Sequence, residues 1–328
     1  MTIAHGERSV PAAFDQRLTQ FRAAGEATRL RLLCLLRDAE LTVTELTRIL
    51  GQSQPGISRH LKLLTEAGLV ERHQEGAWVF YRGTLDAAFT RIVDGLTGSE
   101  IDADRNALEA VRQERAAAAA AYFAEHAAEW DALRRMHLSD AEVEAAMLEL
   151  APRDVGHLID LGTGTGRMLT LFAGRYDSAE GYDTSPEMLS LARVKLDEVG
   201  ITNATVRRGD IGGLEAAGRG DLVLLHHVLH FMAEPERAVG VAARLLAPDG
   251  RIVIADFAPH DHEELRERYA HRRLGFSDEE IGRWAEASEL CVLQSRSFPP
   301  PAGGALTARL WVLGRADETM PQKRVAHG

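Results

Sequence analysis

Three alternating glycines behind an aspartate have the spacing to hold a nucleoside ligand. The sequence IDLGTGTG places Gly162, Gly164 and Gly166 directly after Asp160. Glycine is needed where the backbone turns sharply and lies against a ligand. The dinucleotide-binding pattern G-x-G-x-x-G would need a glycine at position 167, where the chain has arginine. The loop therefore follows a different pattern.

Two further aspartates follow at positions that suit the rest of a nucleoside. Asp183 stands in EGYDTSPEML, and a carboxylate just after the second strand can accept both ribose hydroxyls. Asp210 and Ile211 stand in VRRGDIGGL, after the next apolar run. Asp183 could instead cap a helix, and Asp210 could close a turn. Because both follow successive predicted strands, we interpret them as ligand-binding residues.

Histidines in the sequence LLHHVLHF could accept a proton. His226, His227 and His230 follow an apolar run, and histidine titrates near neutral pH. His227 and His230 are therefore candidate catalytic bases, while the alternative is that all three only pack the edge of a sheet. Residues 260–262 read His-Asp-His, but nothing fixes a third ligand there. We interpret them as the start of a helix and predict no metal site.

The segment 53–65 carries polar side chains that suit a DNA groove. Its apolar residues Ile57, Leu61 and Leu64 form an inward stripe at helical spacing. Glutamine can pair with adenine, arginine with guanine, and serine or lysine with phosphate. The alternative is an ordinary solvated helix face. The candidate DNA-binding residues are Gln52, Ser53, Gln54, Ser58, Arg59, His60 and Lys62.

The elements around this segment favour the DNA interpretation. Residues 14–37, 42–50 and 85–96 have helical periodicity, and residues 69–83 alternate around Glu75-Gly76, which predicts a β-hairpin. Two helices, a recognition helix, a hairpin and a last helix make a winged helix-turn-helix domain. We place this domain at residues 1–98.

The rest of the chain predicts a helical connection and an α/β domain. Residues 99–150 include an alanine run, a strong helix former, and we interpret them as a linker and lid. Strands then alternate with helices, which predicts a doubly wound, Rossmann-like sheet over residues 151–316 that ends in an antiparallel pair. Residues 317–328 are expected to form a loose tail. The candidate strands are 157–161, 178–182, 204–207, 222–225, 251–255, 292–298 and 306–313.

Charge, hydropathy and cysteine content indicate which partners and which cellular location to expect. The net charge of −11 belongs to the C-terminal part, because residues 1–98 hold twelve basic against eleven acidic residues and the rest hold 26 against 38. A near-neutral N-terminal domain can still present a basic face. Apolar runs reach neither membrane-spanning nor signal-peptide length, so we expect no membrane partner. Two cysteines, Cys34 and Cys291, are too few for a disulfide framework and predict a cytoplasmic location.

The N-terminal quarter resembles the ArsR/SmtB family of winged-helix repressors. The resemblance rests on EATRLRLLCLL, ELTVTELTRIL and SQPGISRHLKLLTEAGLVERHQEGAWVFYR, and it implies a homodimer on a palindromic operator, joined through the first and last helices. Arsenic-sensing members carry cysteines where this chain has Thr42 and Thr44, and hydroxyls cannot replace thiolates for a soft metal. The helix 85–96 has no histidine, so the other common zinc site of the family is missing too.

The C-terminal half resembles class I methyltransferases that depend on S-adenosylmethionine (SAM). DLVLLHHVLHFMAEPERAV and LLAPDGRIVIADF match the fourth and fifth strand regions of that family. The resemblance implies that Asp160 and the glycine loop bind SAM or S-adenosylhomocysteine (SAH), that Asp210 binds the adenine amino group with Ile211 against the ring, and that His226 lies near the methyl position. It also makes Tyr122 and Trp130 pocket candidates, although such aromatic residues are more often core.

The two resemblances together imply a DNA-binding regulator, a repressor, that couples SAM or SAH to operator affinity and controls genes of the methionine and SAM cycle. The architecture resembles ArsR-type regulators fused to a SAM-binding domain. The alternative is an active methyltransferase on a small molecule, so enzymatic activity stays open. Arsenite is excluded as substrate, because the two cysteines lie in different domains. Modification of nucleic acid is less favoured, because the C-terminal half is acidic and would repel phosphate.

Overall fold

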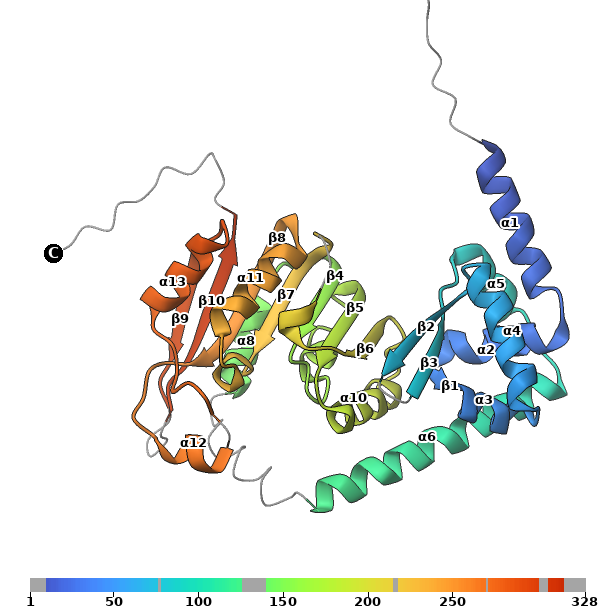
Figure 1. Cartoon of the computed structure of the whole chain (residues 1–328), viewed down its shortest axis with the longest axis horizontal. Coiled ribbons are helices and arrows are strands. Elements are labelled where there is room, and N and C mark those ends of the chain that lie inside the picture. The colour runs from blue at the N-terminus through green and yellow to red at the C-terminus, as the bar shows by residue number, and fades with distance from the viewer. Residues whose placement is uncertain are drawn as a thin grey trace, which may run out of the picture. The chain divides into compact units, whose positions relative to one another are not determined.

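The computed structural model describes residues 10–75, 78–125, 140–214, 218–269, 271–300 and 306–315. The chain divides into two compact units, Met1–Ala117 and Ala118–Gly328 (Figure 1). None of the helices in these described ranges is long and apolar enough to cross a membrane. Trp130, the Gly76 turn and the expected tail at residues 317–328 lie outside the described residues.

The first unit has the element order of a winged helix-turn-helix domain, as predicted. Strand β3 lies between β1 and β2 in a small antiparallel sheet. The elements are α1 (Val10–Ala24), α2 (Ala27–Asp38), β1 (Leu41–Thr42), α3 (Val43–Leu50), α4 (Gln54–Glu66), β2 (Val70–Glu75), β3 (Trp78–Gly83), α5 (Ala87–Asp94) and α6 (Ser99–Glu125).

Local sequence fixes where the two helices of the helix-turn-helix begin and end. Thr42 caps α3, and Gly51 ends it with a φ of 63°, a left-handed conformation that glycine adopts at little cost. Helix α4 starts after Ser53 and carries Pro55 in its first turn, where a missing N–H costs nothing. Gly68, with a φ of 68°, follows its end. These signals are all local, which explains why the sequence places both helices.

The core of the first unit extends beyond the expected boundary at residue 98. Ile57, Leu61 and Leu64 are fully buried, as their spacing predicts. The same cluster also includes Ile101, Leu108 and Val111 of α6. The first turns of α6, up to residue 117, therefore belong to the N-terminal unit and do not form a separate linker.

The second unit is built on one seven-stranded sheet in the order β6-β5-β4-β7-β8-β10-β9 (Figure 1). The first five strands are parallel, while β10 runs antiparallel to both β8 and β9. The strands are β4 (Val155–Leu161), β5 (Tyr176–Asp183), β6 (Ala204–Arg208), β7 (Gly220–His226), β8 (Leu246–Phe257), β9 (Cys291–Phe298) and β10 (Ala308–Gly314). This confirms the predicted Rossmann-like sheet with its antiparallel end.

Helices cover both faces of this sheet, because successive strand residues point to opposite sides. Leu158 and Leu224 pack in the cluster that includes α8, α9 and α10. Ile159 and Val223 pack in the opposite cluster, with α11 and α13. The helices are α8 (Asp140–Leu150), α9 (Arg167–Leu171), α10 (Pro186–Glu198), α11 (Pro235–Leu245), α12 (Glu264–Tyr269) and α13 (Asp278–Ala287), with short 3₁₀ turns η1 (Ile211–Gly213) and η2 (Leu229–Phe231).

The C-terminal end of the expected linker, residues 99–150, forms helix α8 and packs into the core of the second unit. Val143 and Met147 are fully buried in the cluster beneath the sheet. Within residues 99–150, both described ends thus stabilise a unit, the N-terminal end through α6 and the C-terminal end through α8.

Candidate ligand and DNA-binding sites

The glycine loop after β4 adopts a conformation that only glycine accepts readily. Gly162, Gly164 and Gly166 have φ values of 78°, 52° and 75°, all in the left-handed region. A Cβ at Gly162 would lie 2.7 Å from Val228 Cβ, so this glycine permits a close packing contact. A Cβ at Gly164 would have no heavy atom within 4 Å. Gly164 therefore leaves open space beside the backbone, as a ligand-facing loop requires.

Asp183 holds this loop through its carboxylate. Its Oδ2 accepts a hydrogen bond from the Gly164 N–H at 2.9 Å, and its Oδ1 accepts one from the Ser185 N–H at 2.9 Å. Helix α10 is capped by Ser185, which accepts from the Met188 N–H at 3.2 Å. The N-cap role considered for Asp183 thus belongs to Ser185, and Asp183 lies at the loop where a ribose could bind.

Asp160 is the most unusual carboxylate of the loop region. It is completely buried, and neither carboxylate oxygen has a hydrogen bond of acceptable geometry within the described part of the chain. Burial raises its pKa to about 7; the nearby Asp183 charge adds to the rise, while the Thr163 hydroxyl opposes it. Such a carboxylate is costly to ionise and suits a position that a cationic ligand group compensates.

Asp210 and Ile211 follow β6, as predicted, but Asp210 also has a structural role. Its Oδ1 accepts a hydrogen bond from the Gly212 N–H at 3.1 Å and caps the turn η1. The residue is exposed, so the carboxylate remains accessible. Ile211 is buried in the core cluster beside α11. The turn that was considered as the alternative for Asp210 is therefore present, and adenine binding stays a prediction.

The loop residues gather at the carboxyl ends of neighbouring parallel strands. The chain leaves β4 for β5 and β6 on one side and later returns to β7 on the other. The strand order reverses at β4, and ligands of open α/β sheets bind in the crevice at such a switch point. The open space at Gly164 and the carboxylates of Asp160 and Asp183 fit a nucleoside that carries positive charge.

Two of the three predicted histidines, His227 and His230, meet an aspartate that sequence reasoning missed. His230 Nδ1 lies 2.8 Å from Asp256 Oδ1, and the His230 N–H donates to Asp256 Oδ2 at 3.3 Å. Both side chains are buried. His227 has a φ of 51°, and its N–H donates to the Ala255 carbonyl at 2.8 Å. The signal for Asp256 was a lone charge inside the apolar strand sequence IVIADF, where burial demands a partner.

Among the remaining predicted pocket residues, His226 ends β7 at the same sheet edge and is half-buried. Tyr122 lies in α6, but its side chain is outside the described part of the structure, as is the whole of Trp130. The lid role of these two aromatic residues remains a prediction.

The predicted recognition helix is α4, and most of its candidate residues face solvent. Ser53, Gln54, Ser58, Arg59 and Lys62 are exposed. This row of hydroxyl, amide and cationic groups fits a DNA groove.

Two of the candidates turn toward α2 instead of solvent. Gln52 donates a hydrogen bond to the Thr28 hydroxyl at 3.1 Å. The His60 ring lies 3.5 Å from Arg29 Nη1 and 3.5 Å from Glu26 Oε2. These residues position the helix, because their polar groups already have partners within the unit.

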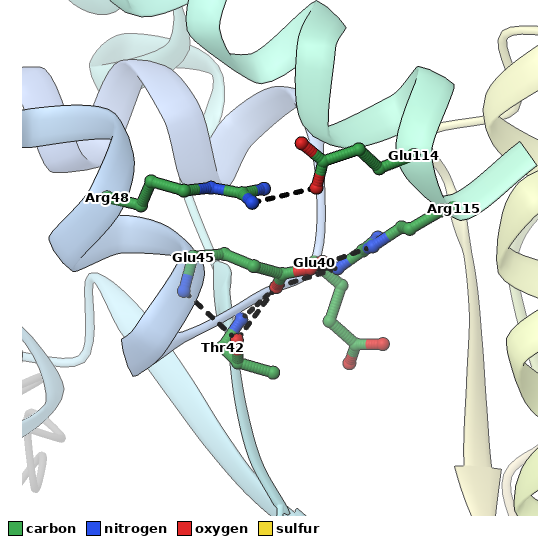
Figure 2. A network of polar contacts seen from close by, with 6 residues as sticks. All are labelled: Glu40, Thr42, Glu45, Arg48, Glu114 and Arg115. Carbon is green, nitrogen blue, oxygen red and sulfur yellow. Dashed lines mark hydrogen bonds and ion pairs between the residues drawn. The ribbon is translucent and has the colours of Figure 1, made fainter. Parts of the chain in front are cut away.

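The start of α3, where the resemblance implied thiolates in arsenic-sensing members, is a closed polar network in this chain (Figure 2). Thr42 accepts from the Glu45 N–H at 3.3 Å, and Glu45 Oε2 accepts from the Thr42 N–H at 2.8 Å, which makes a capping box. Arg115 of α6 donates to both Glu45 oxygens at 2.9 Å. Arg48 contacts Glu114 at 2.7 Å. Carboxylates, hydroxyls and guanidinium groups satisfy one another, and Thr44 is exposed beside them.

Comparison with known proteins assigns each unit. A family model described as bacterial regulatory protein, arsR family, matches residues 26–72, and a methyltransferase-domain model matches residues 153–293. The chain is 42% identical over 62 residues to an uncharacterized HTH-type transcriptional regulator, MJ1325, of Methanocaldococcus jannaschii, covering 19% of this chain and 70% of that protein. The chain belongs to the arsR family. Its second unit is a methyltransferase domain.

Two further relatives match one unit each. The arsenic resistance transcriptional regulator ArsR1 of Pseudomonas putida is 41% identical over 86 residues, which cover 26% of this chain and 66% of the regulator. Demethylmenaquinone methyltransferase of Thermus thermophilus is 31% identical over 145 residues, which cover 42% of this chain and 64% of the enzyme. The chain thus spans just under two thirds of the length of each.

Proposed function

We propose that this arsR-family protein is a transcriptional repressor whose methyltransferase domain binds SAM or SAH and couples that ligand to operator affinity. The observation that carries the proposal is the pairing of an exposed polar α4 face with a nucleoside-type glycine loop in one chain. The genes controlled would then be ones that handle the ligand, in the methionine and SAM cycle.

The DNA-binding part of the proposal rests on α4. Arg59 and Lys62 are exposed on the side opposite the buried stripe of Ile57 and Leu61. Arginine can bind a guanine edge through two hydrogen bonds, whereas lysine supplies a phosphate contact. We therefore expect Arg59 to specify sequence and Lys62 to add affinity that does not depend on sequence.

The ligand-binding part rests on the loop after β4. SAM carries a sulfonium and an ammonium group, and its adenosine presents ribose hydroxyls. The buried Asp160 would gain from a cationic neighbour, since burial raises its pKa to about 7. Asp183 would accept the ribose hydroxyls, and Gly164 leaves the required space beside the backbone. Asp210 and Ile211 would hold the adenine.

Helix α6 is the element we expect to couple the two bindings. It begins in the N-terminal unit and continues past residue 117 into the second unit. Within the first unit, Arg31 holds Asp104 of α6 through two hydrogen bonds of 2.7 and 2.6 Å. Arg115 of the same helix contacts the cap of α3, which precedes the recognition helix. A ligand that shifts α6 would therefore act on the helix-turn-helix.

The proposed oligomer is a homodimer, and exposed aromatic residues support it. Phe14 and Phe21 of α1 are 67% and 53% exposed, and Ile92 of α5 is 40% exposed. Phe21 also contacts Phe89 of α5, with ring centroids 5.2 Å apart. Exposed apolar side chains on adjacent helices indicate an interaction surface. A second copy of this chain, paired through α1 and α5, would match a palindromic operator.

The decisive test titrates operator DNA with the full-length protein by fluorescence anisotropy at fixed salt, with SAM and SAH added separately. We expect one ligand to change the operator affinity and the other to have less effect. If the ligand weakens operator binding tenfold, which corresponds to about 1.4 kcal/mol, DNA must weaken ligand binding by the same factor. If calorimetry shows both ligands bound while neither changes DNA affinity, the regulatory proposal is wrong.

Two matched pairs of variants separate the two bindings. Arg59→Ala should abolish operator recognition and leave SAH binding intact, while Lys62→Ala should weaken binding to all DNA sequences equally. Asp183→Ala should remove the ligand response and retain DNA binding without ligand. Glu187→Ala, at the second residue of α10, is its control, because that side chain is exposed and accepts from the Ser185 hydroxyl at 2.8 Å, outside the glycine loop.

The coupling through α6 has its own test. Residues 126–129 and 131–139 are replaced by glycine and serine, which preserves the described parts of α6 and α8 and keeps Trp130, a predicted pocket residue. We expect both bindings to remain and their coupling to disappear. Persistent coupling in this variant would contradict the role of α6.

A second candidate function is methyl transfer to a small molecule, which the buried His230–Asp256 pair favours. A carboxylate on one ring nitrogen orients an imidazole as a proton acceptor. Release of SAH from SAM in the presence of candidate acceptors, lost in His230→Gln, would support an enzyme.

A further inference from the structure

The histidines after β7 gather with Asp256 into a group that the proposed regulation of DNA binding does not use. One ligand atom from each of His227, His230 and Asp256 lies within 4.8 Å of the others. The residues come from the carboxyl ends of β7 and β8, two adjacent parallel strands in the middle of the sheet. We propose that these three side chains bind a divalent transition-metal ion, of which Zn²⁺ is the representative.

The donor set determines the class of ion. Two imidazoles and one carboxylate are the ligands of three-residue zinc sites that keep a fourth position open. Imidazole nitrogen disfavours Mg²⁺ and Ca²⁺, which prefer all-oxygen sites, and the absence of thiolate from this group disfavours soft ions. The site would therefore not serve the arsenic chemistry after which relatives of the first unit are named.

The geometry needs only a small adjustment. Bonds of about 2.1 Å to a tetrahedral zinc ion place donor atoms about 3.4 Å apart. His230 Nδ1 and Asp256 Oδ1 lie 2.8 Å apart in a hydrogen bond, so an ion would replace that hydrogen bond and move the two atoms apart by about 0.6 Å. The ligand atoms of all three residues lie within 4.8 Å of one another, so the half-buried His227 side chain would move closer to the other two.

Rigid surroundings hold the donors together. Asp256 Oδ1 also accepts from the Phe257 N–H at 2.8 Å, and its Oδ2 accepts from the His230 N–H. The backbone of His227 is held at a φ of 51° by its hydrogen bond to Ala255. Strained backbone of this kind, held by its surroundings, is characteristic of functional sites.

Further imidazoles surround the group. The His271 ring is 4.2 Å from the His230 ring, between centroids, and is buried. Phe257 lies against His227, His230 and His271, at 4.8, 5.1 and 6.0 Å. A buried carboxylate gains from a cation, and His271 is near enough to be considered as a fourth ligand.

The test measures Zn²⁺ bound to the full-length chain. Protein stripped with a chelator is loaded with Zn²⁺, passed through a desalting column and analysed for metal, and Co²⁺ loading reports nitrogen coordination by its visible absorption. We expect one tightly held ion per chain, with at least a tenfold loss of affinity in His227→Asn, His230→Gln and Asp256→Asn. His227→Asn is the most informative, because asparagine accepts a left-handed backbone.

A matched control excludes surface binding. His262 lies 3.0 Å from Glu264 on an exposed segment, so His262→Gln should bind Zn²⁺ as the unmodified chain does. The proposal is overturned if His227→Asn retains the ion, if His262→Gln loses it, or if the unmodified chain leaves the column without metal. Circular dichroism of each variant shows whether a loss reflects unfolding, and His227→Asn decides the outcome if the buried variants do not fold.

Discussion

The start of α3 and the carboxyl ends of β7 and β8 both gather polar side chains, but the two sets combine different groups. Around Thr42, the hydroxyl, the Glu45 carboxylate and the Arg115 guanidinium satisfy one another (Figure 2). At the carboxyl ends of β7 and β8, two imidazoles and a carboxylate converge, with one ligand atom from each within 4.8 Å of the others. Closed networks stabilise a fold, whereas convergent donors are available to a ligand.

The comparison also locates where a signal can enter. In the N-terminal unit, Glu45 and Arg48 of α3 connect this helix to α6 through ion pairs with Arg115 and Glu114. In the second unit, the glycine loop and the histidine group lie at one edge of one sheet. A ligand would thus bind the second unit, and the first unit would respond through α6.

The largest effect is expected from Asp104→Ala, which breaks a buried ion pair between α2 and α6, next to the network at the start of α3 in the N-terminal unit. Asp104 is buried and binds Arg31 through two hydrogen bonds. Removing one partner of a buried pair costs about 3–5 kcal/mol, which urea unfolding followed by circular dichroism would show. Glu114→Ala is the control, because its pair with Arg48 is exposed and contributes about 1 kcal/mol or less. Equal losses in the two variants would contradict this account.

The second effect is a pH dependence that originates at Asp160. Its pKa is raised by burial from 3.8 to about 7, so the folded state holds a proton that the unfolded chain releases earlier. The resulting stabilisation is complete below pH 3.8 and is lost as pH rises through about 7. We expect stability to fall by up to about 4 kcal/mol relative to Asp160→Asn over this window. If the free energies of unfolding of the unmodified chain and of Asp160→Asn change in parallel with pH, Asp160 does not titrate in this window.

The third effect concerns the glycine loop. Gly162→Ala would bring a methyl group against Val228, and overpacking of this kind costs about 1–3 kcal/mol in addition to backbone strain. Gly174→Ala is the control, because its φ is 80° but nothing lies within 4 Å. In Gly162→Ala, SAH binding measured by calorimetry should also be weaker. The double variant Gly162→Ala/Val228→Ala should recover part of the lost stability. A variant as stable as the Gly174 control would disprove the packing role.

The smallest effect is expected at Thr42. Thr42→Ala removes the α3 cap, which costs about 0.5–2 kcal/mol, whereas Thr44→Ala at the exposed neighbouring position should change stability by less than about 0.5 kcal/mol. Thermal unfolding would compare the two. If Thr44→Ala is the more harmful change, the network does not depend on Thr42 as proposed.

Local and periodic features were sufficient to predict most of the fold. The stripe of Ile57, Leu61 and Leu64 predicted α4. In the second unit, apolar runs separated by helical segments predicted all seven strands of its sheet. Capping and turn residues such as Thr42 and Gly51 act within a few residues of their own position. Such signals are readable in a sequence because their partners are nearby in the chain.

The boundary of the N-terminal unit depended on distant contacts instead. Residues 99–117 are helical by composition, but only packing shows that Ile101 and Val111 belong to the first core. Periodicity in an alanine-rich helix cannot indicate which surface it covers.

The sequence by itself determined the two domain types, the glycine loop and the recognition helix, because each is a contiguous motif. Tertiary structure decided that Gln52 and His60 face α2, that Asp183 holds the loop at Gly164, and that Asp256 meets His227 and His230. The physical reason is parallel strand pairing. It brings the ends of β7 and β8 together, although the histidines and Asp256 are separated by a whole helix in the chain.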